Sequence, residues 1–97
     1  MQGQVVLVTG AGRGIGQAIA ERFGAAGANV VVNDVDAEAA GATAASITES
    51  AGHALTAAAD VSDSAQVGVM FDLAVTTFGT VDALVNNAGL VLSLIHY

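Results

Sequence analysis

The chain has 97 residues, 54% of them hydrophobic and 11% charged, and its formal net charge at pH 7 is −7. This length suits one small domain, and the hydrophobic fraction excludes an acidic disordered chain. Cysteine is absent, which excludes disulfides and thiolate metal sites, and the negative charge disfavours nucleic acid as a partner. We expect a cytoplasmic protein without a metal or a membrane segment. The N-terminus lacks a signal-peptide pattern, and no apolar run approaches the roughly 18–20 residues of a membrane helix.

Short apolar runs alternate with segments of helical periodicity. Residues 5–8, a run of valine and leucine, predict a strand buried on both faces. A glycine-rich turn at residues 10–16 follows, and Gly27 is placed to end the next helix. The apolar face expected for that helix consists of Ile15, Ala18, Ile19, Phe23 and Ala26.

The second unit repeats this order. Residues 30–32 are three valines, which predict another buried strand that ends near Asp34. Asp36 can cap the helix that follows, because its carboxylate can accept hydrogen bonds from the first backbone N–H groups. That helix has a thin apolar face and ends before Gly52.

The third unit is less regular. Residues 55–59 predict a weaker strand, because alanine has little preference for β-structure. Ser62 is expected to cap a third helix that Gly79 closes, although Gly68 within it costs about 1 kcal/mol relative to alanine. Residues 81–85 predict a fourth strand. The order β-α-β-α-β-α-β, without proline, predicts an α/β fold with a parallel sheet and helices on its faces.

The turn after the first strand, TGAGRGIG at residues 9–16, has the composition of a phosphate-binding loop. Gly10 permits a tight turn, while Gly12 and Gly14 let a ligand approach the backbone. Gly16 allows the helix to pack closely on the sheet. Exposed N–H groups and the positive end of the helix dipole then face an anion, here the pyrophosphate of a dinucleotide.

Two charged residues bear on which dinucleotide is bound. Asp34 can accept hydrogen bonds from both hydroxyls of an adenosine ribose, and it repels a 2′-phosphate. Otherwise it is a solvated acid at a strand end. Arg13 is an opposing signal, because its guanidinium could pair with a 2′-phosphate, although it is equally an exposed loop residue. NAD is therefore the favoured cofactor and NADP the less favoured one.

Three motifs together resemble the short-chain dehydrogenase/reductase family. They are Thr-Gly-x-x-x-Gly-x-Gly from Thr9 to Gly16, Asp60-Val61 after the third strand, and the turn Asn86, Asn87, Ala88, Gly89 after the fourth. The resemblance covers residues 4–89 and implies a Rossmann-like, doubly wound parallel sheet. Residues 1–89 would be the N-terminal part of an NAD(P)-binding Rossmann domain, truncated after about four strands, and residues 90–97 a divergent C-terminal tail.

The resemblance implies a role for each matched residue. Thr9 and the four glycines would form the pyrophosphate loop, with main-chain contacts from Arg13 and Ile15. Asp60 would bind the adenine amino group, and the backbone of Val61 would contact the ring. The asparagine turn would pass beneath the cofactor ribose and brace the central strands. Taken alone, Asp60 can also belong to a helix cap, and paired asparagines are common in turns.

The family's catalytic residues are not found in this sequence. The resemblance implies hydride transfer between a nicotinamide and an alcohol or carbonyl carbon, with a Tyr-x-x-x-Lys pair moving the proton. The sequence has no lysine, so no catalytic residue is assigned, and Ser93, His96 and Tyr97 are given no role. The prediction is a truncated oxidoreductase that binds NAD(H), lacks its substrate site and is catalytically incompetent alone. The alternatives are a non-enzymatic nucleotide-binding or interaction module and half of a methyltransferase.

Residues 90–97, LVLSLIHY, depart from the family pattern. They are apolar and uncapped, and we expect a short strand or a disordered end left by a truncation. Without further strands, the far edge of the fourth strand would be open and apolar surface would be exposed. Self-association through that edge is therefore predicted.

Overall fold

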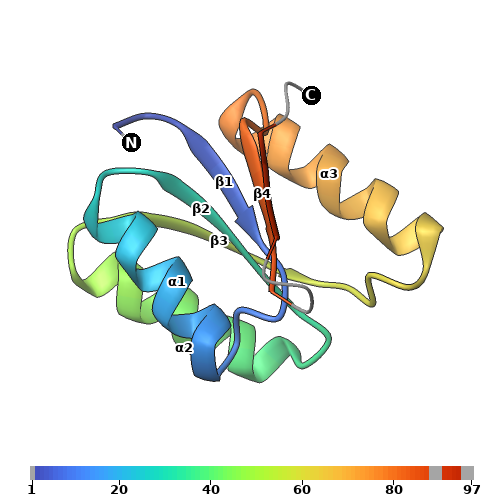
Figure 1. Cartoon of the computed structure of the whole chain (residues 1–97), viewed down its shortest axis with the longest axis horizontal. Helices are drawn as coiled ribbons and strands as arrows, with labels where there is room; N and C mark the ends of the chain where they lie inside the picture. Colours follow the sequence, from blue (N-terminus) through green and yellow to red (C-terminus); the bar gives the residue numbers. More distant parts are fainter. Residues whose placement is uncertain (1, 88–90, 95–97) are drawn as a thin grey trace.

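Four parallel strands alternate with three helices, and a further strand follows the fourth, in the part of the chain that the structure describes (Figure 1). The computed structural model describes residues 2–87 and 91–94. In chain order the elements are β1 (Val5–Val8), α1 (Gly14–Ala25), β2 (Asn29–Asp34), α2 (Ala37–Glu49), β3 (His53–Ala58), α3 (Ser64–Phe78), β4 (Ala83–Asn86) and β5 (Val91–Leu94).

The strands form one sheet in the order β3-β2-β1-β4-β5. β1 lies between β2 and β4 and is parallel to both, with Val6 opposite Val30 on one side and Ala83 on the other. The chain thus moves outward from β1 to β3 and then returns to the other side of β1. α1 and α2 cover one face of the sheet and α3 covers the other (Figure 1). This confirms the predicted α/β, Rossmann-like doubly wound fold.

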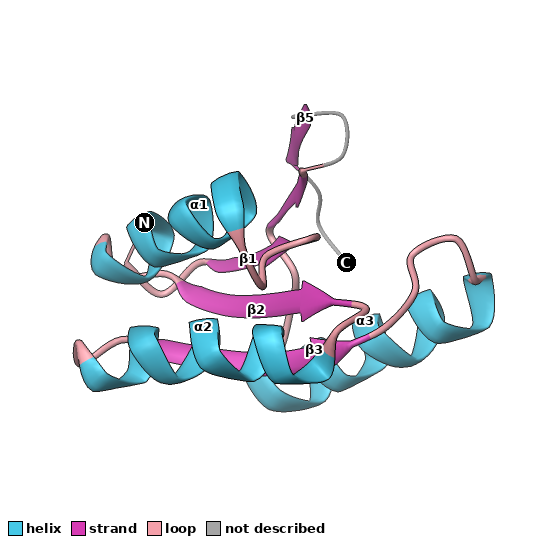
Figure 2. Ribbon diagram, turned by 90° about the horizontal axis from the view of Figure 1, so that it is seen from below, coloured by secondary structure: helices cyan, strands magenta, loops and turns pink. Residues whose placement is uncertain are grey.

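The edge of β4 is paired, so the predicted open edge at that strand is wrong. β5 runs antiparallel to β4 and places Ser93 opposite Leu84, at the end of the sheet away from β3 (Figure 2). Valine and leucine favour extended structure, and the pairing satisfies backbone groups that an open edge would leave to solvent. The outer strands of the described sheet are therefore β3 and β5. Self-association through a sheet edge stays a prediction.

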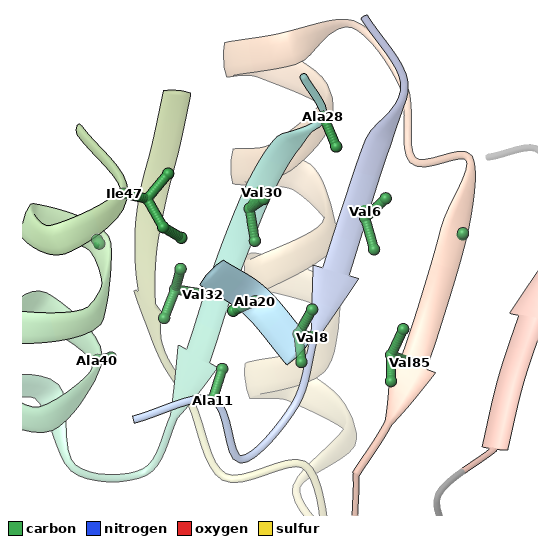
Figure 3. Packing of buried hydrophobic residues seen from close by; sticks show 12 residues of the cluster. Val6, Val8, Ala11, Ala20, Ala28, Val30, Val32, Ala40, Ile47 and Val85 are labelled. Atoms are coloured by element: carbon green, nitrogen blue, oxygen red, sulfur yellow. The ribbon is translucent and has the colours of Figure 1, made fainter. Parts of the chain in front are cut away.

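Two hydrophobic clusters lie on opposite faces of the sheet. Val6 and Val8 belong to the cluster beneath α1 and α2, whereas Val5 and Leu7 belong to the cluster beneath α3. Figure 3 shows the first cluster, which also contains Val30, Val32 and Ile47. Successive side chains of a strand point to opposite faces, so a strand that is apolar at every position is one covered on both faces. The apolar run of β1 is explained in this way.

The buried face of α1 agrees only in part with the predicted one. Ile19 and Phe23 are partly buried and pack against the first cluster, as predicted, whereas Ile15 is 61% exposed. The fully buried residues of α1 are small: Gly16, Ala20 and Gly24. A Cβ at Gly24 would lie 2.7 Å from Cγ2 of Ile47 in α2, so the small residues let the two helices approach closely. Hydrophobic periodicity identifies the larger apolar residues of the face but not these small ones.

The N-terminal cap agrees with the prediction in α2 and differs in α3. Asp36 Oδ1 accepts hydrogen bonds from two backbone N–H groups in the first turn of α2. The predicted cap of α3, Ser62, is wrong, because Asp63 is the N-cap residue and accepts two such bonds. Asp63 directly precedes the helix, and an ionised carboxylate is the stronger acceptor. The Ser62 hydroxyl instead donates to Asp60.

Candidate functional site

The carboxyl ends of β1, β2, β3 and β4 meet at one edge of the sheet, where a cavity of about 250 Å³ opens. In open α/β sheets this edge binds ligands, at the point where the strand order reverses. That point lies between β1 and β4. The predicted cofactor residues that line the cavity are Thr9, Gly10, Asp34, Asp60, Val61 and Asn87. The predicted residues Ala88 and Gly89 lie outside the described residues.

Two larger hollows are not lined by a comparable group of predicted cofactor residues. One, of about 560 Å³, runs along α1 and is lined by apolar side chains and Arg22; Ile15 is the predicted residue that faces it. The other, of about 300 Å³, lies between β3 and α3, and its lining is also mainly apolar. Volume alone would favour these hollows, but the polar groups that can orient a ligand converge on the smaller cavity.

The glycine loop joins β1 to α1 without a capping side chain. Gly10 and Gly14 have φ angles of +60° and +61°, which glycine adopts without strain. Arg13, the N-cap residue of α1, makes no side-chain hydrogen bond to the first turn, and that turn contains no acidic residue. In α2 and α3 the corresponding N–H groups are bound by aspartate. The first N–H groups of α1 and the positive end of its dipole therefore suit an anion.

Asp34 is held by backbone N–H groups of two neighbouring loops. Its Oδ2 accepts from the N–H of Gly12 at 2.9 Å, and its Oδ1 accepts from the N–H of Asp36 at 3.0 Å. A Cβ at Gly12 would lie 2.7 Å from Asp34 Oδ2, so this approach requires glycine. Each carboxylate oxygen can accept a second hydrogen bond. Asp34 is thus oriented and still able to bind hydroxyl groups of a ligand.

Arg13 and Asp36 form an ion pair next to Asp34. The guanidinium Nη2 lies 2.6 Å from Asp36 Oδ2, and the two side chains are 71% and 46% exposed. Both residues were identified from the sequence, Arg13 as a loop residue and Asp36 as a helix cap. Their pairing has no sequence signal, because it depends on how the loop after β1 meets the loop after β2.

Thr9 and Asn87 join the glycine loop to the end of β4. The buried Thr9 hydroxyl accepts from the backbone N–H of Asn87 at 3.1 Å, and its Oγ1 lies 3.5 Å from Asn86 Oδ1. Asn87 Nδ2 in turn donates to the carbonyl oxygen of Gly10 at 3.4 Å. These contacts hold together the segments that follow β1 and β4.

Asp60 lines the cavity from the turn between β3 and α3. Its Oδ1 accepts from the Ser62 hydroxyl at 2.7 Å and from the Ser62 backbone N–H at 2.9 Å. These hydrogen bonds, the hydroxyl contact first, lower the pKa of Asp60 below its ordinary value of 3.8. The carboxylate is therefore ionised at neutral pH and acts as an acceptor.

Three residues of the cavity were not predicted, Asn33, Val35 and Ala59. Asn33 is buried, and its amide donates to two carbonyl oxygens at the end of β3 and just beyond it, at 3.0 and 3.1 Å. It therefore ties the ends of β2 and β3 together. Val35 is 75% exposed and, with the half-exposed Val61, gives the cavity an apolar rim. The sequence signal for Asn33 and Val35 is their position on either side of Asp34, and the signal for Ala59 is its position directly before Asp60.

Known proteins share this sequence pattern and fold. The sequence profile of the family described as short chain dehydrogenase matches residues 4–96. The chain belongs to the short-chain dehydrogenase family. The resemblance stated from three motifs is thereby confirmed, and it extends over nearly the whole chain.

Two relatives and one solved structure show how much of a family member's length this chain covers. The chain is 47% identical over 91 residues to 3beta-hydroxysteroid dehydrogenase 1 of Eggerthella lenta, covering 93% of this chain and 35% of the relative. It is 43% identical over 90 residues to glucose 1-dehydrogenase 2 of Bacillus subtilis, covering 92% and 35%. A 7alpha-hydroxysteroid dehydrogenase complexed with NADH and 7-oxo glycochenodeoxycholic acid superposes with a TM-score of 0.85 and 39% identity, covering 88% and 33%. The chain therefore spans about 35% of the length of the curated relatives.

Metal and membrane sites were also sought within residues 2–87 and 91–94. No cluster of three or more histidine or acidic side chains there is placed to hold a metal ion. No helix in this part of the chain has the length and apolar character needed to cross a membrane.

Proposed function

We propose that this chain binds NAD(H) at the carboxyl edge of its sheet, as the cofactor-binding part of an oxidoreductase acting on alcohol or carbonyl groups. The observation that carries the proposal is that the start of the glycine loop and the oriented Asp34 carboxylate line one cavity, and that this loop leads into the uncapped N-terminus of α1. A dinucleotide has the complementary groups, a pyrophosphate and a ribose diol. A steroid dehydrogenase and a glucose dehydrogenase match this region at 47% and 43% identity, so the substrate class is left open.

The glycine loop fits a pyrophosphate. Position 14 has open space around it, whereas Gly12 and Gly16 lie too close to their neighbours to carry a side chain. The loop therefore combines N–H groups with little side-chain bulk, and the first turn of α1 adds its dipole. The pyrophosphate would be held by backbone groups of residues 13–16, because the N–H groups of Ala11 and Gly12 already donate to Asn33 and Asp34.

The rest of the cavity fits the adenosine. Asp34 would accept hydrogen bonds from the ribose hydroxyls, and the exposed valines Val35 and Val61 offer apolar contact for the adenine ring. The ionised Asp60 would accept from the adenine amino group. A 2′-phosphate would place a dianion beside Asp34 in a chain of net charge −7, which favours NAD over NADP.

We propose that catalysis needs residues that are not among the 97 residues of this chain. NAD supplies hydride transfer when bound, and the residues described above would hold and orient it. A Tyr-x-x-x-Lys pair is absent because the sequence has no lysine, and His96 and Tyr97 lie outside the described residues. We therefore expect this chain to bind the dinucleotide without turning over an alcohol. Proton transfer and substrate binding would belong to the part of the family's length that the chain does not span.

Calorimetric titration of the 97-residue chain with NAD⁺ tests the proposal. Asp34→Ala should weaken binding by about tenfold or more, because hydrogen bonds to a charged group are lost. Asp72→Ala, which removes one exposed acid from α3, is the matched control and should leave the affinity unchanged. The proposal fails if NAD⁺ shows no saturable binding at millimolar concentration, or if the two variants behave alike.

A further inference from the structure

The ion pair between Arg13 and Asp36 has no role in the binding of NAD proposed above. The sequence contains two arginines and no lysine. Arg22 lies in the last turn of α1, at the opposite end of that helix from the glycine loop. Of the two arginines, Arg13 is therefore the one near the carboxyl ends of the strands, where the cofactor is proposed to bind. Its contacts decide whether this site can attract an additional phosphate.

The two carboxylate oxygens of Asp36 have separate contacts. Oδ1 accepts from the N–H groups of Glu38 and Ala39 and so caps α2, while Oδ2 pairs with the Arg13 guanidinium at 2.6 Å. The backbone N–H of Asp36 donates to Asp34. The cap and this backbone bond orient the carboxylate, and its second oxygen then holds the guanidinium.

We propose that Asp36 is a specificity-determining residue of this site. It holds the Arg13 guanidinium, so that the cation is not available to a 2′-phosphate. This inference rests on the proposed function, because the ribose is placed at Asp34. To bind, NADP would have to break the ion pair between Arg13 and Asp36 and place its 2′-phosphate beside the carboxylates of Asp34 and Asp36. Both side chains of the pair are substantially exposed, so its contribution is modest and adds to the repulsion from Asp34.

The test compares 2′,5′-ADP with 5′-AMP, which differ only by the 2′-phosphate and need the adenosine half of the site alone. Asp36→Asn retains an Oδ1 acceptor for the α2 cap while removing the charge that binds Arg13. Affinities are measured by calorimetry for the full 97-residue chain, D36N, R13A and the double variant. Glu38→Gln, which removes an equal charge from the first turn of α2, is the control.

We expect D36N to raise the affinity for 2′,5′-ADP relative to 5′-AMP by about two- to fivefold, the range of an exposed ion pair. The rise should disappear in the R13A/D36N double variant, and E38Q should leave the ratio unchanged. Asp36→Ser, a second capping residue, should repeat the D36N result. Circular dichroism confirms that each variant is folded.

Several results would overturn the inference. An unchanged ratio in folded D36N and D36S, an equal rise without Arg13, or an equal rise in E38Q would each show that Asp36 does not act by holding Arg13. In all three cases 5′-AMP still binds, so the proposed function stands. If the unaltered chain binds neither 5′-AMP nor 2′,5′-ADP, the proposed function is wrong and this inference falls with it.

Discussion

Replacement of Gly16 by alanine tests how α1 meets the glycine loop. Gly16 lies in the first turn of α1 and is buried. A Cβ there would collide with the Gly10 carbonyl oxygen and would lie 2.8 Å from the Gly10 carbonyl carbon and 2.9 Å from Asn87 Nδ2. Because Gly10 contributes backbone atoms, the main chain itself has to move. Overpacking of this kind lowers the free energy of unfolding by about 1–3 kcal/mol.

The matched control is Gly68→Ala in α3. Gly68 is also inside a helix, but it is exposed and no atom lies within 4 Å of its Cβ position. Alanine there should stabilise the chain by about 0.5–1 kcal/mol through helix propensity. Since 1 kcal/mol shifts Tm by about 4–8 °C in a domain of this size, we expect a fall of about 4–24 °C for G16A and a rise of about 2–8 °C for G68A.

The assay measures Tm by circular dichroism and then the NAD⁺ affinity of the folded variants by titration. The collision involves Gly10 and Asn87, which line the cofactor cavity, so G16A should lose NAD⁺ affinity as well as stability. G68A should keep the affinity. A Tm for G16A at or above that of the unaltered chain, or an NAD⁺ affinity equal to that of G68A, would refute this account of the loop.

Three further substitutions test the core, a cap and a turn. Leu7→Ala, at a fully buried position of β1, should lower the free energy of unfolding in urea by about 2–5 kcal/mol. Asp63→Ala should destabilise the chain by about 1 kcal/mol by removing the N-cap of α3, measured the same way. Ser62→Ala should raise the pKa of Asp60 toward its ordinary value of 3.8 in an NMR titration of the carboxyl carbon. Because folding depresses this pKa, ionised Asp60 stabilises the chain above pH 3.8, and that contribution should be lost as pH falls below it.

Strands buried on both faces were the most predictable elements. The apolar runs of β1 and β2 correspond closely to the observed strands, because both of their faces are covered. β3 begins at His53 rather than at residue 55, since pairing with β2 extends it through residues that carry no apolar signal. The buried face of α1 was predicted only in part, because Ile19 and Phe23 do pack against the core but the fully buried positions are glycine and alanine. The antiparallel pairing of β5 with β4 was not predicted, because the composition of a short apolar segment specifies neither its partner strand nor its direction.

The cofactor residues were predictable where a strand end and a motif coincide. Asp34 is an example, because the end of a parallel strand places its side chain at the binding edge. Asn33 was missed because a buried amide between two strands resembles any other strand residue until β3 is in place. The contact between Arg13 and Asp36 was missed for the same reason, since it links two loops that are distant in sequence.

Chemical-shift mapping of NAD⁺ binding tests the central claim most directly. A ¹⁵N-labelled sample of the 97-residue chain is titrated with NAD⁺, and backbone amide shifts are followed by NMR. The account predicts saturable changes in the glycine loop, at the end of β2 around Asp34, and around Asp60 and Asn87. The amides of Gly27 and Gly52, at the opposite edge of the sheet, should stay unchanged. Changes centred on that opposite edge or on the hollow along α1, or no saturable change at all, would contradict it.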